Sequence, residues 1–456
     1  MGKYFGTDGF RGEAGVELTA LHAFKIGRYL GYHLHGGADG STKRRARAVI
    51  GKDPRLSSYM LEYAIASGLA SSGIDVYLMH VTTTPSVSHI TVSESFDLGV
   101  MITASHNPFL DNGIKIIDSS GEKMDDTLAD KVEEYLDRDE MDSDLPFAKA
   151  GEIGRICDHY AGRNSYIGHL ISLASHSYKG LKIGLDSANG ATFAIARSVF
   201  TALGAEVHTI GTEPNGLNVN YRCGSTHPEA LCDLVREKEL DVGYAFDGDG
   251  DRCIAVGKDG HVIDGDGILY VLARKLKREN RLGGAPVIAT VMSNGGLISS
   301  LKKDGIDSEL TRVGDRFVYE KMLESGSPLG GESSGHIILS NCETTGDGIV
   351  SAIMLTEEMC EKKSSLTELV ADLVYFPQRT ESVRVKNKAA ALSDETVKAV
   401  ISDLTAGKMQ AERLLVRESG TEPKIRIMAE SEHEDRCNFM VDKIVSVLRD
   451  RGYIDE

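Results

Sequence analysis

The stretch ARAVIGKDPRLSSYMLEYAIASGLASSGIDVYLMH, residues 46–80, carries the pattern that decides the fold class. Residues 46–53 are an apolar run of strand length, residues 57–73 have the composition of a helix that ends at Gly73, and residues 75–80 are a second apolar run. A third run, FDLGVMITAS, follows at 96–105. Strands that alternate with helices are typical of α/β units with parallel sheets. The stretch therefore predicts an α/β fold.

The same pattern recurs twice further along the chain. Residues 181–190 (LKIGLDSANG) and 285–296 (APVIATVMSNGG) each read as a strand that runs into a loop of Ser, Asn and Gly, as residues 96–108 do. Because these residue types are common after any strand, the pattern alone leaves open whether the units are related. We predict three related α/β domains with mixed or parallel sheets, at residues 1–154, 155–254 and 255–370.

The last part of the chain has a different pattern. Residues 380–387, 412–419 and 424–431 read as strands, and residues 434–452 read as a closing helix. This order predicts a smaller α+β domain at residues 371–456. Four domains agree with a chain of 456 residues, since a domain typically has about 100–200 residues.

The composition limits the classes of partner. The chain has 51 Lys and Arg against 68 Asp and Glu, a net charge of −17. This argues against nucleic-acid binding, which needs a basic surface, and a site for an anion must supply positive charge locally. The sequence predicts neither a membrane span nor a secretory signal. The seven scattered cysteines form no CxxC pair, which favours the reducing cytoplasm over a disulfide framework or a zinc site.

The most specific motif for a site is YAFDGDGDRCIAV, residues 244–256. Asp247, Asp249 and Asp251 alternate with glycines, and carboxylates this close raise one another's pKa values. A hard divalent cation relieves the repulsion and prefers oxygen ligands. Glycines between the ligands let the backbone curl around an ion. The motif predicts a metal-binding loop between two strands.

A calcium EF-hand and an acidic hairpin turn also place several aspartates close together. An EF-hand needs Gly and Glu at its sixth and twelfth positions, which here hold Arg252 and Lys258, so the motif is not an EF-hand. An acidic hairpin turn is the simpler alternative. Arg252 favours a functional loop, because an arginine beside a metal can bind a ligand phosphate. Asp264 and Asp266 directly precede a helical run, and helix capping is their predicted role.

Two further loops carry anion- or hydroxyl-binding side chains. RLLVRESGTEPKIRI, residues 413–427, places hydroxyls, a glycine and an arginine between two strands, which are the donors that a phosphate clamp needs. PLGGESSGHIIL, residues 328–339, offers Glu332 and Ser334 to sugar hydroxyls. Each loop alone is a weak signal, because such turns are common and a lone histidine such as His336 is most often structural.

The stretch MITASHNP, residues 101–108, places a serine beside a histidine. Adjacent residues usually point apart, a triad base comes from elsewhere in the fold, and the GxSxG elbow is absent. A hydrolase is therefore disfavoured. A phosphoryl-accepting Ser105 agrees better with the metal loop and the phosphate clamp, and we expect His106 and Asn107 to shape the loop.

Four motifs together resemble the α-D-phosphohexomutase family: TASHNP followed by NGIK (103–115), DGDGDR (247–252), GESSGH (331–336) and RESGTEP (417–423). They occur in the family's order over nearly the whole chain, which implies one loop from each of four domains around a central active-site cleft. KYFGTDGFRG (3–12), CGSTHPE (223–229), RVGDRFV (312–318) and Ser333 resemble the bacterial branch that acts on glucosamine phosphates.

The resemblance implies an isomerase that converts glucosamine 6-phosphate to glucosamine 1-phosphate, for UDP-N-acetylglucosamine and cell-wall synthesis. Ser105 would be a phosphoserine that exchanges its phosphoryl group through a sugar 1,6-bisphosphate. Lys115 and Arg252 would be catalytic, Lys115 in proton transfer. The implied Mg²⁺ ligands are Ser105, Asp247, Asp249 and Asp251. The implied substrate-binding residues are Arg11, Glu332, Ser334, His336, Arg417, Ser419, Gly420 and Thr421.

The resemblance leaves two other functions open. One is a phosphomannomutase or phosphoglucomutase of the same family, and the other is a non-catalytic sugar-phosphate sensor on the same fold. The mannose/glucose branch has a histidine in the loop that reads RVGDR here, so that histidine's role does not transfer. The family also suggests a homodimer in the cytoplasm, with a small phosphosugar as its ligand.

Overall fold

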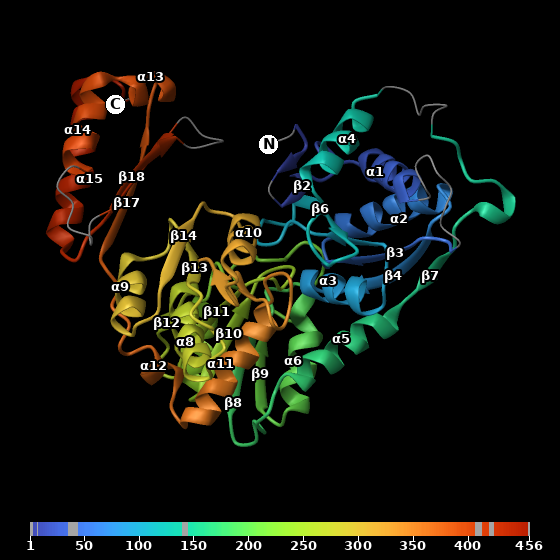
Figure 1. Ribbon diagram of the computed structural model, residues 1–456, viewed down its shortest axis with the longest axis horizontal. Coiled ribbons are helices and arrows are strands. Elements are labelled where there is room, and N and C mark those ends of the chain that lie inside the picture. The colour runs from blue at the N-terminus through green and yellow to red at the C-terminus, as the bar shows by residue number, and fades with distance from the viewer. Residues whose placement is uncertain are drawn as a thin grey trace. The chain divides into compact units, whose positions relative to one another are not determined.

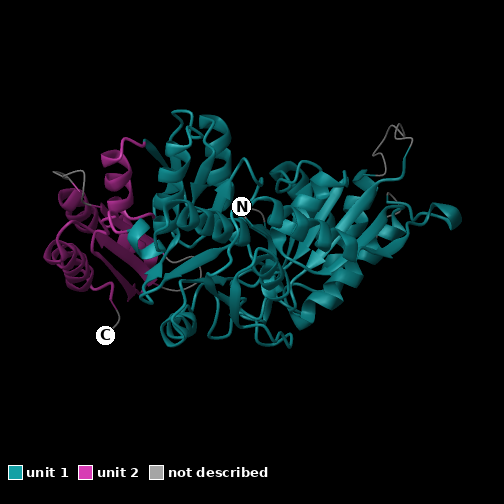
Figure 2. Ribbon diagram, turned by 90° about the horizontal axis from the view of Figure 1, so that it is seen from below, with its two compact units in different colours: residues 1–292, 307–370 teal, residues 293–306, 371–456 magenta. Residues whose placement is uncertain are grey.

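The computed structural model describes residues 3–6, 8–34, 44–138, 145–405, 413–418 and 424–454. The chain forms two compact units, residues 1–292 with 307–370 and residues 293–306 with 371–456 (Figure 2). Each is described by itself. The first unit contains three sheets and the second contains one.

The first sheet is mixed, and its strand order is β1-β2-β6-β5-β3-β4-β7; Figure 1 labels β2, β6, β3, β4 and β7 of this sheet. Its strands are β1 (Phe5–Gly6), β2 (Gly9–Glu13), β3 (Arg47–Lys52), β4 (Asp75–Val81), β5 (Leu98–Ile102), β6 (Asp111–Asp118) and β7 (Ile156–Asp158). The strands β3, β4, β5 and β7 run parallel, and the others pair antiparallel. The three strands predicted at 46–53, 75–80 and 96–105 are therefore confirmed, with bounds shifted by a few residues.

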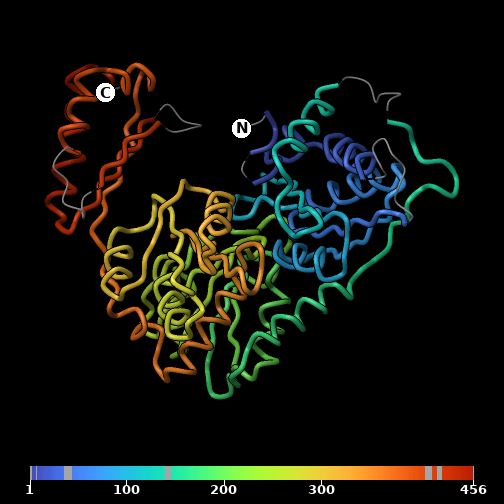
Figure 3. The backbone as a smooth tube through the Cα atoms, viewed as in Figure 1, coloured from blue at the N-terminus to red at the C-terminus, as the bar shows by residue number. Residues whose placement is uncertain are grey.

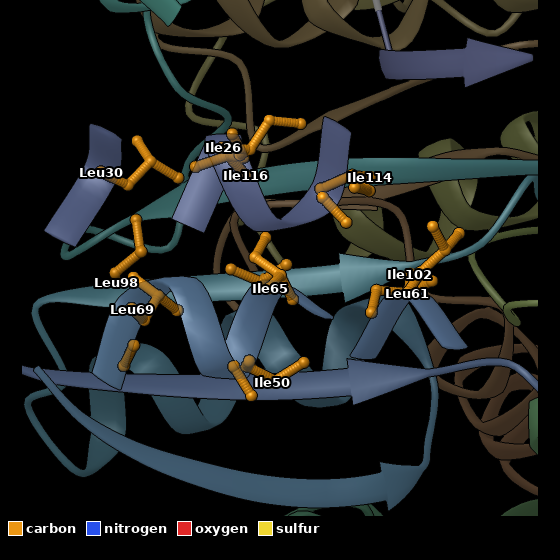
Figure 4. Close-up of a cluster of buried hydrophobic side chains, with 14 of the residues drawn as sticks. Ile26, Leu30, Ile50, Leu61, Ile65, Leu69, Leu98, Ile102, Ile114 and Ile116 are labelled. Atoms are coloured by element: carbon orange, nitrogen blue, oxygen red, sulfur yellow. The ribbon is translucent and has the colours of Figure 1, made fainter. Parts of the chain in front are cut away.

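Helices cover both faces of this sheet: α1 (Ala20–Leu34), α2 (Leu56–Ser71), α3 (Thr84–Ser93) and α4 (Asp126–Leu136). Ile50 packs with α1 and α2 on one face, where Figure 4 shows the cluster. Its neighbour Val49 packs with α3 on the other face. Burial on both faces explains why these strands are continuous apolar runs. Gly73, with φ of +90°, follows α2 as predicted.

The second sheet has the order β12-β11-β10-β8-β9. Its strands are β8 (Lys182–Asp186), β9 (Glu206–Ile210), β10 (Val242–Phe246), β11 (Cys253–Gly257) and β12 (Val262–Ile263). The helices of this region are α5 (Tyr160–Ser172), α6 (Ile195–Ala202) and α7 (Glu229–Lys238). The chain leaves the first sheet after β7 and continues through α5 to the second sheet (Figure 3). The antiparallel strands β10 and β11 enclose the carboxylate loop, as predicted.

The third sheet has the order β14-β13-β15-β16. Its strands are β13 (Val287–Thr290), β14 (Ser308–Thr311), β15 (Leu329–Gly331) and β16 (Ile337–Leu339). The helices are α8 (Gly265–Arg278), α10 (Asp315–Ser325), α11 (Gly348–Lys362) and α12 (Leu366–Leu369). Asp264 caps α8 by accepting a hydrogen bond from the Gly267 N–H at 3.1 Å, which confirms its capping role.

The second unit has a three-stranded antiparallel sheet in the order β17-β19-β18. Its strands are β17 (Gln378–Arg384), β18 (Arg413–Glu418) and β19 (Lys424–Glu430), and its helices are α9 (Gly295–Lys303), α13 (Lys388–Ser393), α14 (Glu395–Thr405) and α15 (Glu434–Asp450). Val441 and Ile444 of α15 are buried with Ile425 and Ile427 of β19. The smaller α+β element order predicted for the end of the chain is confirmed.

The predicted boundaries at 154/155, 254/255 and 370/371 stay predictions. β7 pairs with β4, so the first sheet continues beyond residue 154. β11 and β12 pair with each other, so the second sheet continues beyond residue 254. Within the part of the chain that the structure describes, no helix combines the length and the apolar character needed to cross a membrane.

Candidate active site

Ser105 lies three residues beyond the end of β5, in a tightly constrained loop. Its side chain is almost completely buried, with 1% exposed, and its φ is +50°. A left-handed conformation is costly for a residue with a Cβ and persists only where surrounding contacts impose it. One such contact is the hydrogen bond of 2.9 Å that the Ser105 N–H donates to Oγ1 of Thr103.

The guanidinium of Arg55 holds the Ser105 loop in place. It donates hydrogen bonds of 2.9 Å to the carbonyl oxygens of Ser105 and Asn107, and further bonds to those of Pro108 and Asp111. Arg55 is fully buried, and its Nε donates to the Asp53 carboxylate at 2.7 Å. Sequence reasoning missed this residue, because nothing in the motif TASHNP points to an arginine some 50 positions earlier.

Arg55→Lys is expected to lower kcat by about 10- to 100-fold, because displacing a reacting group by about 1 Å can cost that much. A lysine cannot reproduce the planar set of five donors and would leave buried carbonyls unsatisfied. Steady-state kinetics and the phosphate content of Ser105 test this expectation. The matched control is Arg44→Lys, since Arg44 is 58% exposed and pairs with Asp97. Equal kcat in the two variants would contradict the positioning role.

Asp247, Asp249 and Asp251 converge in the β10–β11 loop. All three are buried, and one carboxylate oxygen of each lies within 4.8 Å of the others. The intervening glycines are required: a Cβ on Gly248 would lie 2.5 Å from the carbonyl oxygen of Ser105, and Gly250 has a φ of +73°. The loop thus brings three carboxylates against the Ser105 loop.

The Ser105 hydroxyl points into the carboxylate triplet. Its Oγ donates a hydrogen bond of 2.6 Å to Oδ2 of Asp247. Nδ1 of His106 lies 3.4 Å from the same Oγ, so the structure does bring the adjacent serine and histidine together. Burial, with the positive charges of Arg252 and Arg11, lowers the pKa of His106 to about 4. His106 is therefore neutral near pH 7.

Lys115, on β6, places a positively charged ammonium group among the carboxylates of the site. Its Nζ lies 2.9 Å from Oδ2 of Asp249, 3.0 Å from Oδ2 of Asp251 and 3.2 Å from Oδ2 of Asp8. Burial disfavours the ammonium, but these carboxylates outweigh it and hold the pKa of Lys115 well above its usual range. Asp8, which also pairs with Arg11 and Lys123, was missed from the sequence. A single aspartate in a glycine-rich segment does not by itself indicate a functional site.

The carboxylate triplet has the chemistry of a cation site. Oδ1 of Asp249 and Oδ1 of Asp251 are buried without a hydrogen-bond partner among the described residues. Burial and the charges of Asp251 and Asp249 raise the pKa of Asp247 well above its usual value. Burial alone would also raise the pKa of Asp251. Its charged form is stabilised by Lys115, His336 and Arg252, which together hold the pKa well below the usual value for an aspartate. Two orphaned carboxylate oxygens beside a third carboxylate suit a metal ion.

Of the other residues of the first unit that the resemblance implies, Arg252 and His336 contact this triplet. The Arg252 N–H donates to Asp247 at 3.2 Å. Nδ1 of His336 is 3.7 Å from Oδ1 of Asp251. Burial alone would lower the pKa of His336, but the negative charge of Asp251 has the larger effect and the pKa is raised. Glu332 accepts a hydrogen bond of 2.9 Å from the Gly314 N–H, in the segment RVGDRFV. Oγ of Ser334 is buried without a hydrogen-bond partner within the described ranges.

The implied phosphate clamp is only partly described. Arg417 is exposed on β18 in the second unit. Ser419, Gly420 and Thr421 lie outside the described residues. The role of these four residues stays a prediction.

A cavity of about 790 Å³ opens beside Lys115. Its basic lining residues are Lys115, Lys123, Arg312 and Arg316, with Gly6 and Gly9 of the first strands. Four carboxylates, those of Asp126, Asp130, Glu133 and Glu320, also line it. Ligand cavities typically measure about 300–1,000 Å³, so a phosphosugar fits this volume. Lys123 lies outside the motifs, whereas Arg312 and Arg316 belong to the segment RVGDRFV without having been singled out as site residues.

Comparisons with known proteins identify the family of the chain. Four domain families described as phosphoglucomutase/phosphomannomutase match the chain: alpha/beta/alpha domain I at residues 2–143, domain II at 164–260, domain III at 264–375 and the C-terminal domain at 382–447. The fold class expected from the sequence, four domains with a distinct C-terminal one, is confirmed.

Full-length relatives are also similar. The phosphoglucosamine mutase of Lachnospira eligens is 50% identical over 454 residues, which cover 99% of this chain and 100% of the relative. That of Bacillus subtilis is 46% identical over 449 residues, 98% of this chain and 99% of the relative.

Solved structures share the fold. A phosphoglucomutase/phosphomannomutase family protein from Burkholderia thailandensis has a TM-score of 0.81 at 22% identity, covering 100% of this chain and 99% of its own. An N-acetylphosphoglucosamine mutase from Aspergillus fumigatus, in complex with GlcNAc-6P and magnesium, has a TM-score of 0.68 at 16% identity, covering 98% and 96%. The resemblance inferred from the four motifs is confirmed: the chain belongs to the phosphoglucomutase/phosphomannomutase family, whose members are phosphosugar mutases.

Proposed function

We propose that this protein is a phosphoglucosamine mutase, which interconverts glucosamine 6-phosphate and glucosamine 1-phosphate and so supplies the synthesis of UDP-N-acetylglucosamine and cell wall. The contact of 2.6 Å between Oγ of Ser105 and Oδ2 of Asp247 carries the proposal. It supports a serine that exchanges a phosphoryl group beside a cation site. The choice of aminosugar rests on relatives of this name at 45–50% identity.

In the resting enzyme, Ser105 carries a phosphoryl group as phosphoserine. The bond between phosphorus and the serine oxygen breaks, and a bond forms to a free hydroxyl oxygen of the bound sugar monophosphate. The Lys115 ammonium donates a proton to the serine oxygen as it leaves and takes the hydroxyl proton of the sugar, so Ser105 ends as a neutral hydroxyl and charge and atoms balance. The sugar 1,6-bisphosphate then reorients in the site, so that its other phosphate faces Ser105. Ser105 takes this phosphoryl group by the reverse step. Lys115 assists the proton transfer.

The ligands proposed for Mg²⁺ are Asp247, Asp249, Asp251 and the phosphate on Ser105. When bound, Mg²⁺ would neutralise charge on the phosphoryl oxygens and act as a Lewis acid. Arg252 and Arg11 bind the reacting phosphate with charge-assisted hydrogen bonds. This division of tasks agrees with phosphoryl transfer, which depends mainly on positioning and on charge neutralisation.

Two phosphates at opposite ends of one sugar need two anion sites. We assign the idle phosphate to Arg417, Ser419, Gly420 and Thr421, and the sugar hydroxyls to Glu332 and Ser334, with His336 beside them. These assignments follow from the position of each residue within the family's motifs. They remain proposals.

Relative rates on three substrates test the proposed specificity. With Mg²⁺ and a sugar 1,6-bisphosphate as activator, kcat/KM is expected to be highest for glucosamine 6-phosphate, ahead of glucose 6-phosphate and mannose 6-phosphate. A coupled assay that detects each 1-phosphate product measures this order. If the aminosugar were the poorest of the three, the protein would instead be a phosphomannomutase or phosphoglucomutase.

The proposal extends to the cellular setting. We place the enzyme in the cytoplasm, with a small phosphosugar as its ligand and no nucleic-acid partner. The acidic charge of −17 supports the last point. A homodimer, which the family suggests, is tested by light scattering of the purified full chain.

A further inference from the structure

A second cluster of metal-ligating side chains lies in the first unit, outside the proposed active site. It consists of His89 on α3, His169 on α5 and Glu343 in the segment between β16 and α11. These residues fall within the matches to domains I, II and III, respectively. The cluster therefore joins three parts of the chain that are distant in sequence. We call it the His-His-Glu cluster.

The three side chains converge on one point. Nδ1 of His89 lies 3.1 Å, and Nε2 of His169 lies 2.8 Å, from the same atom, Oε1 of Glu343. The two imidazole rings are stacked, with centroids 4.1 Å apart and planes inclined by 27°. One nitrogen from each histidine and one carboxylate oxygen all lie within 4.8 Å of one another. Two imidazoles and a carboxylate are a common donor set for zinc.

Hydrogen bonding alone does not account for this arrangement. Although Nε2 of His169 is in contact with Glu343, it is buried and has no well-aligned hydrogen-bond partner among the described residues. Stacked imidazoles also repel each other when both are protonated. Neutral imidazoles that turn their lone pairs toward a cation satisfy both nitrogens at once and avoid the repulsion.

One further carboxyl group lies near the cluster, and the two histidines are partly exposed. Asp347 lies near Glu343, and burial together with the charge of Glu343 raises the pKa of Asp347 to about 7. The side chains of His89 and His169 are 16% and 24% exposed, so an ion can reach them, whereas Glu343 is only 6% exposed. A divalent cation at this point would balance the negative charges of Glu343 and Asp347.

We propose that His89, His169 and Glu343 bind a divalent transition-metal ion of the zinc type, in addition to the cation at the aspartate triplet. The donor types separate the two sites, because two imidazole nitrogens favour zinc whereas an all-oxygen set favours magnesium. The ion would link α3, α5 and the segment between β16 and α11. Its effect reaches the other site through α3, since Thr84 at the start of this helix donates a hydrogen bond to Asp249.

Zinc binding by the untagged full chain tests the proposal. The chain is dialysed against excess Mg²⁺ and a small molar excess of Zn²⁺ over the chain, and bound zinc is measured by mass spectrometry. We expect about one zinc ion per chain. His169→Gln and His89→Gln should each weaken zinc binding by more than about 100-fold, because loss of a mere outer-shell partner costs about 10- to 100-fold. His208→Gln is the matched control, since His208 pairs with Glu206 at 2.9 Å in the same way but outside the cluster.

A spectrum and a melting curve make the test independent of folding defects. Co²⁺ bound to the chain should show visible absorption bands that disappear in His169→Gln, while Zn²⁺ should raise the Tm of the wild type and of His208→Gln only. Glu343→Gln, which keeps the side-chain shape, provides a third variant. Zinc binding that is undetectable in the wild type, equal in the cluster variants, or abolished instead by Asp249→Asn would overturn the proposal.

Discussion

The Ser105→Ala variant is expected to lose at least about four orders of magnitude in kcat, as is typical when a catalytic nucleophile is removed. The substitution removes the only oxygen of the side chain, so no phosphoserine can form. A water molecule in the place of this Oγ, which donates to Asp247 at 2.6 Å, would not be bonded to the chain and so could not serve as the covalent carrier. Binding of the sugar phosphate should survive, since the proposed anion-binding arginines are unchanged.

Three measurements on this variant separate the possible functions. Turnover is followed in the coupled assay, and binding of glucosamine 6-phosphate is followed by titration calorimetry, because the chain has no tryptophan to report it. Intact-mass spectrometry should find one phosphate on the wild type and none on Ser105→Ala. Ser71→Ala, which removes a hydroxyl bonded to the Gly68 carbonyl at 2.8 Å, is the control. Unchanged turnover in Ser105→Ala would refute the mechanism, and a wild type that binds but never turns over would be a sensor.

The Asp249→Asn variant is expected to lose about three orders of magnitude in kcat at a given Mg²⁺ concentration, since a catalytic metal contributes several kcal/mol. Asp249 has one oxygen bonded to Lys115 and Thr84 and a second, Oδ1, that is buried without a partner in the described part of the chain. The amide removes one negative charge and one cation ligand. Chelation of the metal in the wild type should cause a comparable loss that added Mg²⁺ reverses.

The dependence of kcat on Mg²⁺ concentration distinguishes this loss from a folding defect. Asp249→Asn should need more Mg²⁺ for half-maximal rate than the wild type. Asp259→Asn is the matched control, because Asp259 lies on the next hairpin turn, where it accepts from the His261 N–H at 3.1 Å. An unchanged Mg²⁺ requirement in Asp249→Asn would exclude this carboxylate as a ligand.

Much of the fold was predictable because its signals are local. Val49 and Ile50 face opposite buried surfaces of one sheet, and burial on both sides leaves a continuous apolar run in the sequence. Gly73 and Asp264 mark helix ends through conformation and capping. The predicted bounds of strands and helices differ from those in the structure by a few residues, because the ends of these elements depend on neighbours that local patterns do not contain.

The candidate site was predictable where its residues share a motif. Asp247, Asp249 and Asp251 are separated by single glycines, so their convergence is a property of the local chain. The supports of the site were not predictable. Arg55 and Asp8 reach it from other strands and loops, and no spacing in the sequence encodes their contacts with Ser105 and Lys115.

The sequence by itself determined the α/β class and the family, and it singled out Ser105 and the three aspartates as candidate site residues, because these depend on periodicity and on short motifs. Only the tertiary structure decided that Ser105 donates to Asp247, that Lys115 lies between Asp249 and Asp251, and that His89, His169 and Glu343 meet. Such contacts join residues from different sheets and helices. Their distances are set by packing and burial over the whole unit, which no local stretch of the chain contains.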